Sequence, residues 1–188
     1  TLGAWVGISS LRHMVNRLRK PGRIATSFWG QHVAHLGLAV LVLGITGVKS
    51  YEVERDVRMG IGDVVTIGEL SFQFKSMSEV TGPNYRAHRA LFEVSRNGQV
   101  IEQLSPEKRR YFSSAMPMTE AAIDSGWWRD LYVSLGDVVQ NTPLEWSVRV
   151  YYKPFVPWLW GGVMLMTLGG VLAALDRRYR KAPKGGQA

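Results

Sequence analysis

Two histidines, His32 and His35, lie three positions apart in an uncharged segment that runs from Phe28 to Val48. An imidazole donates and accepts hydrogen bonds, carries protons and binds metals, heme iron among them. Three roles are therefore open for His35: a hydrogen bond to a neighbouring helix, an axial bond to a metal or heme, and a step in a proton path. The segment has no carboxylate and the chain has no cysteine, so this ligand chemistry fits heme better than zinc.

The segment that carries these histidines is long enough to cross a membrane. Its 21 residues would measure about 31 Å as an α-helix, close to the hydrocarbon thickness of a bilayer. We therefore predict a transmembrane helix over residues 28–48. In that helix His35 would lie about 10 Å inside the hydrocarbon and His32 about 6 Å, which gives His35 the greater need of an internal partner.

Basic residues gather on both flanks of the chain, whose formal net charge is +8. Residues 1–27 hold five basic residues and no acid, and residues 176–188 hold five basic residues and one acid. Positive charge beside apolar segments is typical of the cytoplasmic ends of membrane helices rather than of a nucleic-acid-binding face. A second uncharged segment, residues 155–175, predicts a transmembrane helix that returns to the cytoplasmic side.

The segment between the two predicted helices, residues 49–154, has the apolar alternation of β-strands. Some eight strand-length stretches are separated by glycine or proline, and Asn97–Gly98 predicts a type I′ hairpin. Residues 118–124 fit either a strand or a short helix. We therefore predict a polytopic α-helical membrane protein fragment with an inserted all-β domain, barrel or sandwich, on the periplasmic side.

The remaining stretches complete this organisation. Residues 1–11 are expected to be the tail of a preceding membrane helix, residues 12–27 a cytoplasmic basic loop, and residues 176–188 a cytoplasmic tail. Glycines recur every seven positions in residues 28–48 and form two pairs in residues 155–175. Such spacing is typical of close helix packing, and the approach of a flat ligand is the alternative.

Few polar residues outside the predicted helices indicate chemistry. We expect His13 and His88 to be solvated. For His88, which lies beside Arg86 and Arg89, contact with an anionic propionate is the alternative. Trp127 and Trp128 are interpreted as a hydrophobic tip at the membrane face or a docking surface, and a core or interface role is favoured over ligand contact. A charged series is expected to form a solvated or domain-packing surface: Arg109, Arg110, Glu120, Asp124, Arg129 and Asp130. We find no paired nucleophile and base, and therefore predict no catalytic residue in this chain.

Seven segments, in one order, resemble the C-terminal region of the CcmF family, the heme lyase subunits of cytochrome c-type biogenesis among the heme handling proteins. The resemblance extends over nearly all of residues 25–180. The segments are AHLGLAV (34–40), YEVERDVRM (51–59), EVTGPNY (79–85), EKRRYF (107–112), MTEAAID (118–124), RDLYVSLGD (129–137) and YYKPFVPWLWGG (151–162).

The resemblance implies a heme lyase of the bacterial inner membrane that joins heme to the CxxCH thiols of apocytochrome c. It implies the chaperone holo-CcmE as the source of heme, and CcmH and CcmI as partners. It also implies a structural heme b whose axial histidine in AHLG corresponds to His35, whereas His32 matches no family ligand. The second heme ligand and the family's other working residues are expected in an upstream part of the same membrane protein.

Two other functions stay open beside the heme lyase subunit. A membrane-anchored β scaffold would recruit assembly partners without a heme of its own, in keeping with a predicted β domain that shows no catalytic groups. A transporter half with His35 as a proton relay fits less well. Transporter sites are usually built on broken helices, and residues 28–48 contain no proline.

Overall fold

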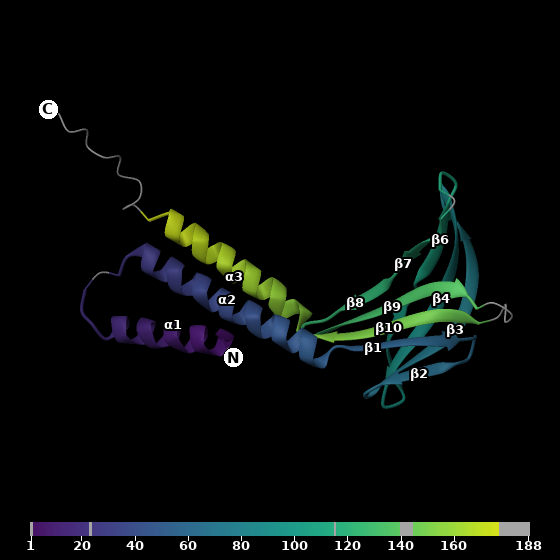
Figure 1. Ribbon diagram of the computed structural model, residues 1–188, viewed down its shortest axis with the longest axis horizontal. Coiled ribbons are helices and arrows are strands. Elements are labelled where there is room, and N and C mark those ends of the chain that lie inside the picture. Colours follow the sequence, from purple (N-terminus) through teal and green to yellow (C-terminus); the bar gives the residue numbers. More distant parts are fainter. Residues whose placement is uncertain (1, 23, 115, 140–144, 177–188) are drawn as a thin grey trace. The chain divides into compact units, whose positions relative to one another are not determined.

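The computed structural model describes residues 2–22, 24–114, 116–139 and 145–176 (Figure 1). These residues form two compact units. The helical unit consists of residues up to Ser50 and from Phe155 onward. The β unit consists of Tyr51–Pro154. Most of the predicted cytoplasmic tail, residues 177–188, lies outside the described residues.

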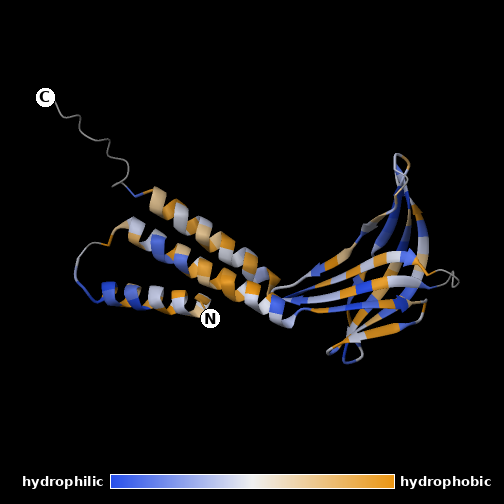
Figure 2. Cartoon of the chain, viewed as in Figure 1, coloured by the Kyte–Doolittle hydropathy of each residue, from blue (hydrophilic) through white to orange (hydrophobic). Residues whose placement is uncertain are grey.

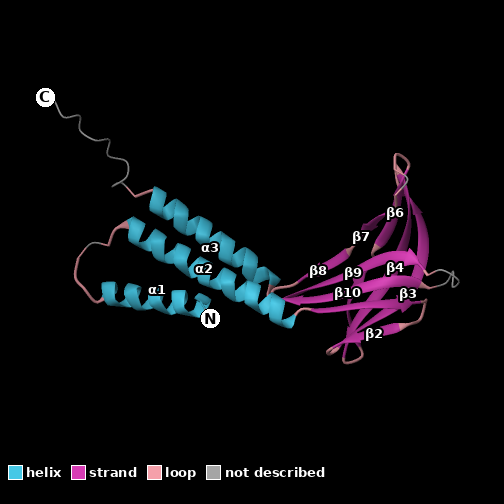
Figure 3. Ribbon diagram, in the orientation of Figure 1, coloured by secondary structure: helices cyan, strands magenta, loops and turns pink. Residues whose placement is uncertain are grey.

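The helical unit contains three helices (Figure 3): α1, Leu2–Leu18; α2, Thr26–Tyr51; and α3, Val156–Ala174. By length and composition, α2 and α3 could each cross a membrane. Figure 2 shows both of them coloured mainly as hydrophobic. Each contains or nearly coincides with one of the two segments from which the sequence predicts a helix.

The first helix is longer than the sequence predicts. A loop is expected from residue 12 onward, but α1 continues as one helix to Leu18. No proline or glycine lies between Gly7 and Pro21, and arginine is a good helix former, so the basic residues do not end the helix. Arg17 lies in its last turn, where the helix dipole favours a cation. The connection between α1 and α2 is correspondingly shorter than the predicted loop.

Glycines bring α2 and α3 into backbone contact. A Cβ atom on Gly37 would lie 2.6 Å from a backbone nitrogen of α3, and one on Gly162 would lie 2.7 Å from a backbone nitrogen of α2. Real Cβ atoms do not approach so closely, so these positions require glycine. The helix-packing interpretation is therefore confirmed for them. Gly161 and Gly170 differ, because a Cβ atom on either would meet nothing within 4 Å.

The β unit consists of two antiparallel sheets. One sheet has the order β1-β10-β9-β8, and the other has the order β2-β3-β4-β6-β7 with β5 also paired to β4. The strands of the first sheet are β1 (Val53–Met59), β8 (Ala122–Ser125), β9 (Arg129–Val138) and β10 (Trp146–Pro154). Those of the second are β2 (Val64–Ile67), β3 (Leu70–Thr81), β4 (Tyr85–Arg96), β5 (Gln99–Leu104), β6 (Glu107–Tyr111) and β7 (Met118–Glu120).

The core of the β unit lies between the inner faces of these two sheets. Alternate residues of β3, β4, β9 and β10 point inward, because successive side chains of a strand face opposite ways. Phe72, Phe74 and Phe92 from one sheet and Val133 and Val150 from the other have no exposed surface. Of the two predicted architectures, barrel and sandwich, the structure is a sandwich.

Local turn chemistry is confirmed, and one ambiguous segment is resolved. Asn97 and Gly98 both have positive φ, 52° and 79°, as a type I′ turn requires, and they join β4 to β5. Residues 118–124 are not helical. They form β7, which pairs with β6, and β8, which pairs with β9, so the chain passes from one sheet to the other at Ala121.

Candidate functional site

His35 presents one ring nitrogen away from its own helix. Its side chain is exposed in the described structure, and its Nδ1 lies 2.7 Å from the backbone oxygen of Gln31, one turn earlier on α2. A carbonyl oxygen only accepts, so in the neutral ring the proton is on Nδ1 and the lone pair is on Nε2. Histidines that bind metals typically hold their second nitrogen in this way, by donating to a carbonyl. The hydrogen bond runs to its own helix and not to a neighbouring one.

His32 uses both of its ring nitrogens within the helical unit. It is only 3% exposed, and its Nδ1 donates to the backbone oxygen of Phe28 at 2.8 Å. Its Nε2 then accepts from Nδ1 of His13 on α1, at 3.1 Å. The rings of His32 and Phe28 also contact each other, with centroids 4.1 Å apart and planes tilted by 32°. His32 is therefore a packing residue, and His13 is exposed but not merely solvated, since it bonds to His32.

A cleft of about 200 Å³ on the helical unit is lined by all three of these histidines. Its other lining residues are Trp5, Val6, Ser9, Ser10 and Gln31. In the described part of the chain, no group of three or more His, Cys, Asp or Glu side chains is placed to hold a metal ion. An axial position on a heme needs only one imidazole from this chain. His35 fits that requirement, because its Nε2 has no hydrogen bond to any described residue.

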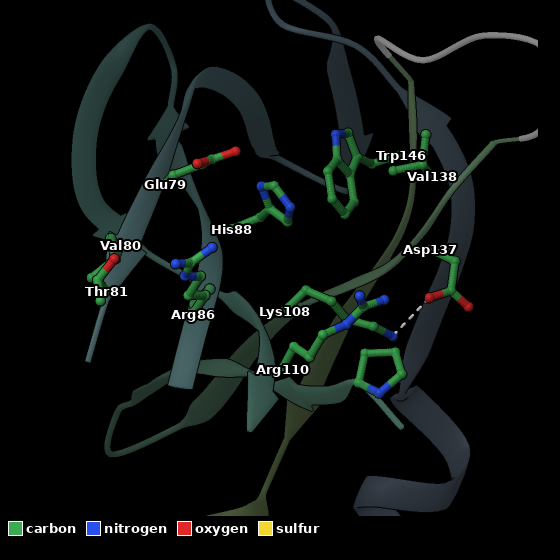
Figure 4. Close-up of a pocket in the computed structure, with 12 residues that line it drawn as sticks. Glu79, Val80, Thr81, Arg86, His88, Lys108, Arg110, Asp137, Val138 and Trp146 are labelled. Carbon is green, nitrogen blue, oxygen red and sulfur yellow. Dashed lines mark ion pairs between the residues drawn. The ribbon is translucent and has the colours of Figure 1, made fainter. Parts of the chain in front are cut away.

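His88 lies in the β unit, on β4. It is half-buried rather than solvated, and its ring centroid lies 5.3 Å from that of Trp146 on β10. Both residues line a cavity of about 440 Å³, and Arg86 lines it too (Figure 4). Arg89 lies on the opposite face of the strand, where it pairs with Glu107.

Glu107 forms the centre of a charge cluster on that opposite face. It is 5% exposed and accepts hydrogen bonds from Nε of Arg89 at 2.5 Å and from Nε of Arg109 at 2.7 Å. Burial disfavours its charged form, but the hydrogen bonds and positive charges of Arg109 and Arg89 outweigh burial. The pKa of Glu107 therefore lies below its ordinary value of 4.5. Arg109, a member of the charged series predicted to form a solvated or domain-packing surface, therefore belongs to an ion network centred on a buried carboxylate.

The end of β8 and the start of β9 carry a second cluster. Arg129 donates to Asp124 at 2.5 Å, and Asp130 is 5% exposed. Burial raises the pKa of Asp130 above its ordinary value, although a backbone hydrogen bond from Gly126 opposes the shift. The turn between these strands presents Trp127 and Trp128, which are 89% and 68% exposed. The core interpretation of the two tryptophans is wrong, and their exposure fits either a hydrophobic tip or a docking surface.

One part of the 440 Å³ cavity was not predicted. Lys108 on β6 lies in its wall and pairs with Asp137 at 3.1 Å. Arg86 and His88 alternate along one strand-like stretch, as Lys108 and Arg110 do along another. Because successive side chains of a strand face opposite ways, each pair lies on one face of its strand, and this much is predictable from the sequence. The antiparallel pairing of β4 with β6, which brings the two pairs together, is not predictable from the sequence.

A family model described as the CcmF C-terminal beta-sandwich matches residues 50–154, which is the whole β unit. The chain belongs to the CcmF family. Its similarity to the family extends beyond the β unit. The cytochrome c-type biogenesis protein CcmF of Escherichia coli (strain K12) is 46% identical over 180 residues, covering 96% of this chain. CcmF of Pseudomonas aeruginosa is 46% identical over 185 residues, covering 95% of it.

The chain corresponds to the C-terminal region of CcmF and spans 28% of the length of either of these relatives. A solved structure, cytochrome c heme lyase CcmF, superimposes on 78% of the chain with a TM-score of 0.64 and 20% sequence identity. The chain covers 24% of that structure. At this identity the superposition concerns the fold, which CcmF and this chain share.

Proposed function

We propose that this chain is the C-terminal part of a heme lyase for cytochrome c maturation, and that His35 supplies one axial ligand to a heme b. The observation that carries the proposal is the 2.7 Å hydrogen bond from Nδ1 of His35 to the backbone oxygen of Gln31. This bond leaves the lone pair of Nε2, on an exposed side chain, available to coordinate a metal. Neutral imidazole is a good axial ligand of heme iron. The second axial ligand would come from an upstream part of the same membrane protein, since the relatives are far longer.

In this proposal α2 and α3 span the bacterial inner membrane, and the β unit lies in the periplasm. Asp176, just after α3, accepts a hydrogen bond at 2.8 Å from the backbone nitrogen of Ser27 in the first turn of α2. The start of α2 and the end of α3 are therefore neighbours in the helical unit. The basic residues before Ser27 and after Asp176 would then share one side, which the positive-inside rule assigns to the cytoplasm.

The proposed partners are those that the family's activity requires. Apocytochrome c presents its CxxCH thiols, holo-CcmE delivers heme, and CcmH and CcmI assemble with the enzyme. The β unit would offer binding surfaces to them: the exposed Trp127–Trp128 turn is one and the cationic cavity is another. We assign no catalytic residue to this chain.

The proposal is tested by replacing His35 with alanine in the full membrane protein that contains this chain. We expect the heme content or the low-spin b-type visible spectrum of the purified protein to be lost, because one axial ligand is gone. Added imidazole should restore the spectrum if the protein is folded around an empty ligand position. Leu43→Ala, an exposed position two turns along α2, is the control and should keep the spectrum. An unchanged low-spin spectrum in His35→Ala would remove His35 as the ligand.

The second candidate is a membrane-anchored β scaffold that recruits assembly partners without a heme of its own. The observation in its favour is the open cationic cavity of the β unit, which suits binding. The two functions differ in cytochrome c maturation. A scaffold predicts normal maturation with His35→Ala and loss of maturation when residues 51–154 are deleted, whereas the heme lyase proposal predicts loss in both.

A further inference from the structure

The inner face of the six-stranded sheet changes from apolar to charged along β4. Ala90, Phe92 and Val94 point into the core and have no exposed surface. Arg86 and His88 continue the same face of the strand, because alternate residues share a side. The sandwich is therefore not closed by apolar side chains at this end. It opens into the cavity of about 440 Å³.

A pair of like charges lies at this opening. Arg86 on β4 is directly opposite Arg110 on β6, in the register that also pairs His88 with Lys108. Like charges opposite each other on neighbouring strands destabilise a sheet. Lys108 is compensated by Asp137 at 3.1 Å and donates to Thr119 at 3.2 Å. Neither Arg86 nor Arg110 has an ion pair with any residue that the structure describes.

The two arginines are accessible from two sides. The 440 Å³ cavity has Trp146 and His88 on another part of its wall, as Figure 4 shows. A second cavity, of about 420 Å³, is lined by the same two arginines together with Tyr111, Phe112 and Ser114. Both cavities therefore have the two arginines and at least one aromatic side chain in their lining. A ligand entering either opening would meet positive charge and a flat apolar surface.

We propose that this place in the β unit binds a carboxylate carried by a ligand with an apolar or aromatic body. Arg86 and Arg110 would hold the carboxylate, since a planar guanidinium matches a carboxylate with two parallel hydrogen bonds. Trp146 or Phe112 would contact the body of the ligand. Glu79 and Asp137 also line the larger cavity and reduce its positive charge, which favours a carboxylate over a polyphosphate.

The shared chemistry has two possible sources, a porphyrin propionate and an acidic residue or C-terminal carboxylate of a polypeptide. The site lies wholly within the β unit and uses none of the residues of the helical unit. The inference therefore goes beyond the role proposed for His35, and either proposal can fail while the other stands.

Binding is measured on the purified chain in detergent with two pairs of probes. Metal-free protoporphyrin IX, which needs no axial ligand, is compared with its dimethyl ester, which lacks the carboxylates. A fluorescent peptide with glutamate beside phenylalanine is compared with the same peptide carrying glutamine. We expect one acidic probe to bind at least tenfold more tightly than its neutral counterpart, because hydrogen bonds between charged groups are the strong ones. The probe that binds identifies the source.

Arg86→Gln/Arg110→Gln should weaken that probe at least tenfold and abolish its preference over the neutral counterpart. Arg58→Gln makes the same kind of change at an exposed position on β1, outside either cavity, and should leave binding unchanged. Arg110→Gln should also raise the melting temperature of the ligand-free chain, since it relieves the like-charge pair. The proposal is overturned if no acidic probe binds the unaltered chain, if the neutral probes bind equally well, or if the double variant binds unchanged.

Discussion

Glu107 is the buried carboxylate whose ion pairs make the clearest prediction at the scale of one residue. Its folded pKa lies below 4.5, so its ionised form stabilises the fold at neutral pH, and this contribution is lost as pH falls from about 4.5 through the folded value. Glu107→Gln removes charge from two hydrogen bonds. We expect it to lower the free energy of unfolding by about 2 kcal/mol at pH 7, measured by urea unfolding of the chain.

The same substitution should flatten the acid dependence of stability below pH 4.5. Glu69→Gln is the matched control. Glu69 is highly exposed, and its ion pair with Arg96 is long, at 4.0 Å. An exposed pair contributes little, so this control should change the unfolding free energy by less than about 0.5 kcal/mol. Equal effects of the two substitutions would contradict the role given to the Glu107 network.

Residue-scale features were predictable from sequence when they depend on one segment. His35 stands out because it lies in an uncharged segment, and its hydrogen bond to Gln31 is a contact within one helical turn. The bond from His13 to His32 was not predictable, because it needs α1 to fold back along α2 and bring residues 19 positions apart together. The burial of Glu107 likewise depends on the pairing of β4 with β6.

At the scale of an element, the glycines of α3 give a prediction with its control in the adjacent position. A Cβ atom on Gly162 would lie 2.7 Å from the backbone nitrogen of Leu41, whereas one on Gly161 would meet nothing within 4 Å. Gly162→Ala should therefore push α2 and α3 apart and cost about 1–3 kcal/mol. Gly161→Ala should be neutral or stabilise the chain by up to about 1 kcal/mol, because alanine favours the helix.

The melting temperature of the chain in detergent distinguishes the two variants, with proteolysis of the helical unit as a second measurement. If both alanines are tolerated equally, the backbone contact between α2 and α3 is not the source of their stability. Gly169 and Gly170 allow the same comparison farther along α3. A Cβ atom on Gly169 would clash with the backbone of Ala34, whereas one on Gly170 would meet nothing within 4 Å.

Elements were predicted where their signal is local. Apolar length gave α2 and α3, and the Asn97–Gly98 pair gave the β4–β5 hairpin. Residues 118–124 were ambiguous between strand and helix. Each half pairs with a different sheet, and the pattern of apolar residues within the segment does not show this. The extra length of α1 was missed because basic residues were expected to end it, although they favour a helix as long as no proline intervenes.

At the scale of the whole molecule, the pairing of the first and last strands explains how a β unit is inserted between two consecutive helices. β1 and β10 are antiparallel neighbours, from Val53 opposite Tyr152 to Met59 opposite Trp146. The chain therefore enters and leaves the β unit at adjacent points. The core residues of the unit all lie between Tyr51 and Pro154, and none comes from the helices.

We therefore expect residues 51–154 to fold when they are expressed without the helices. The isolated unit should unfold cooperatively and show slow amide exchange in β4, β9 and β10, whose core residues are at most 8% exposed. Phe92→Ala should destabilise it by about 3–5 kcal/mol, because Phe92 has no exposed surface and stacks on Phe74 at 4.8 Å. Val100→Ala, at an exposed position of β5, should change its stability by less than about 0.5 kcal/mol. A fragment without a cooperative transition would show that the helices contribute to the folding of the β unit.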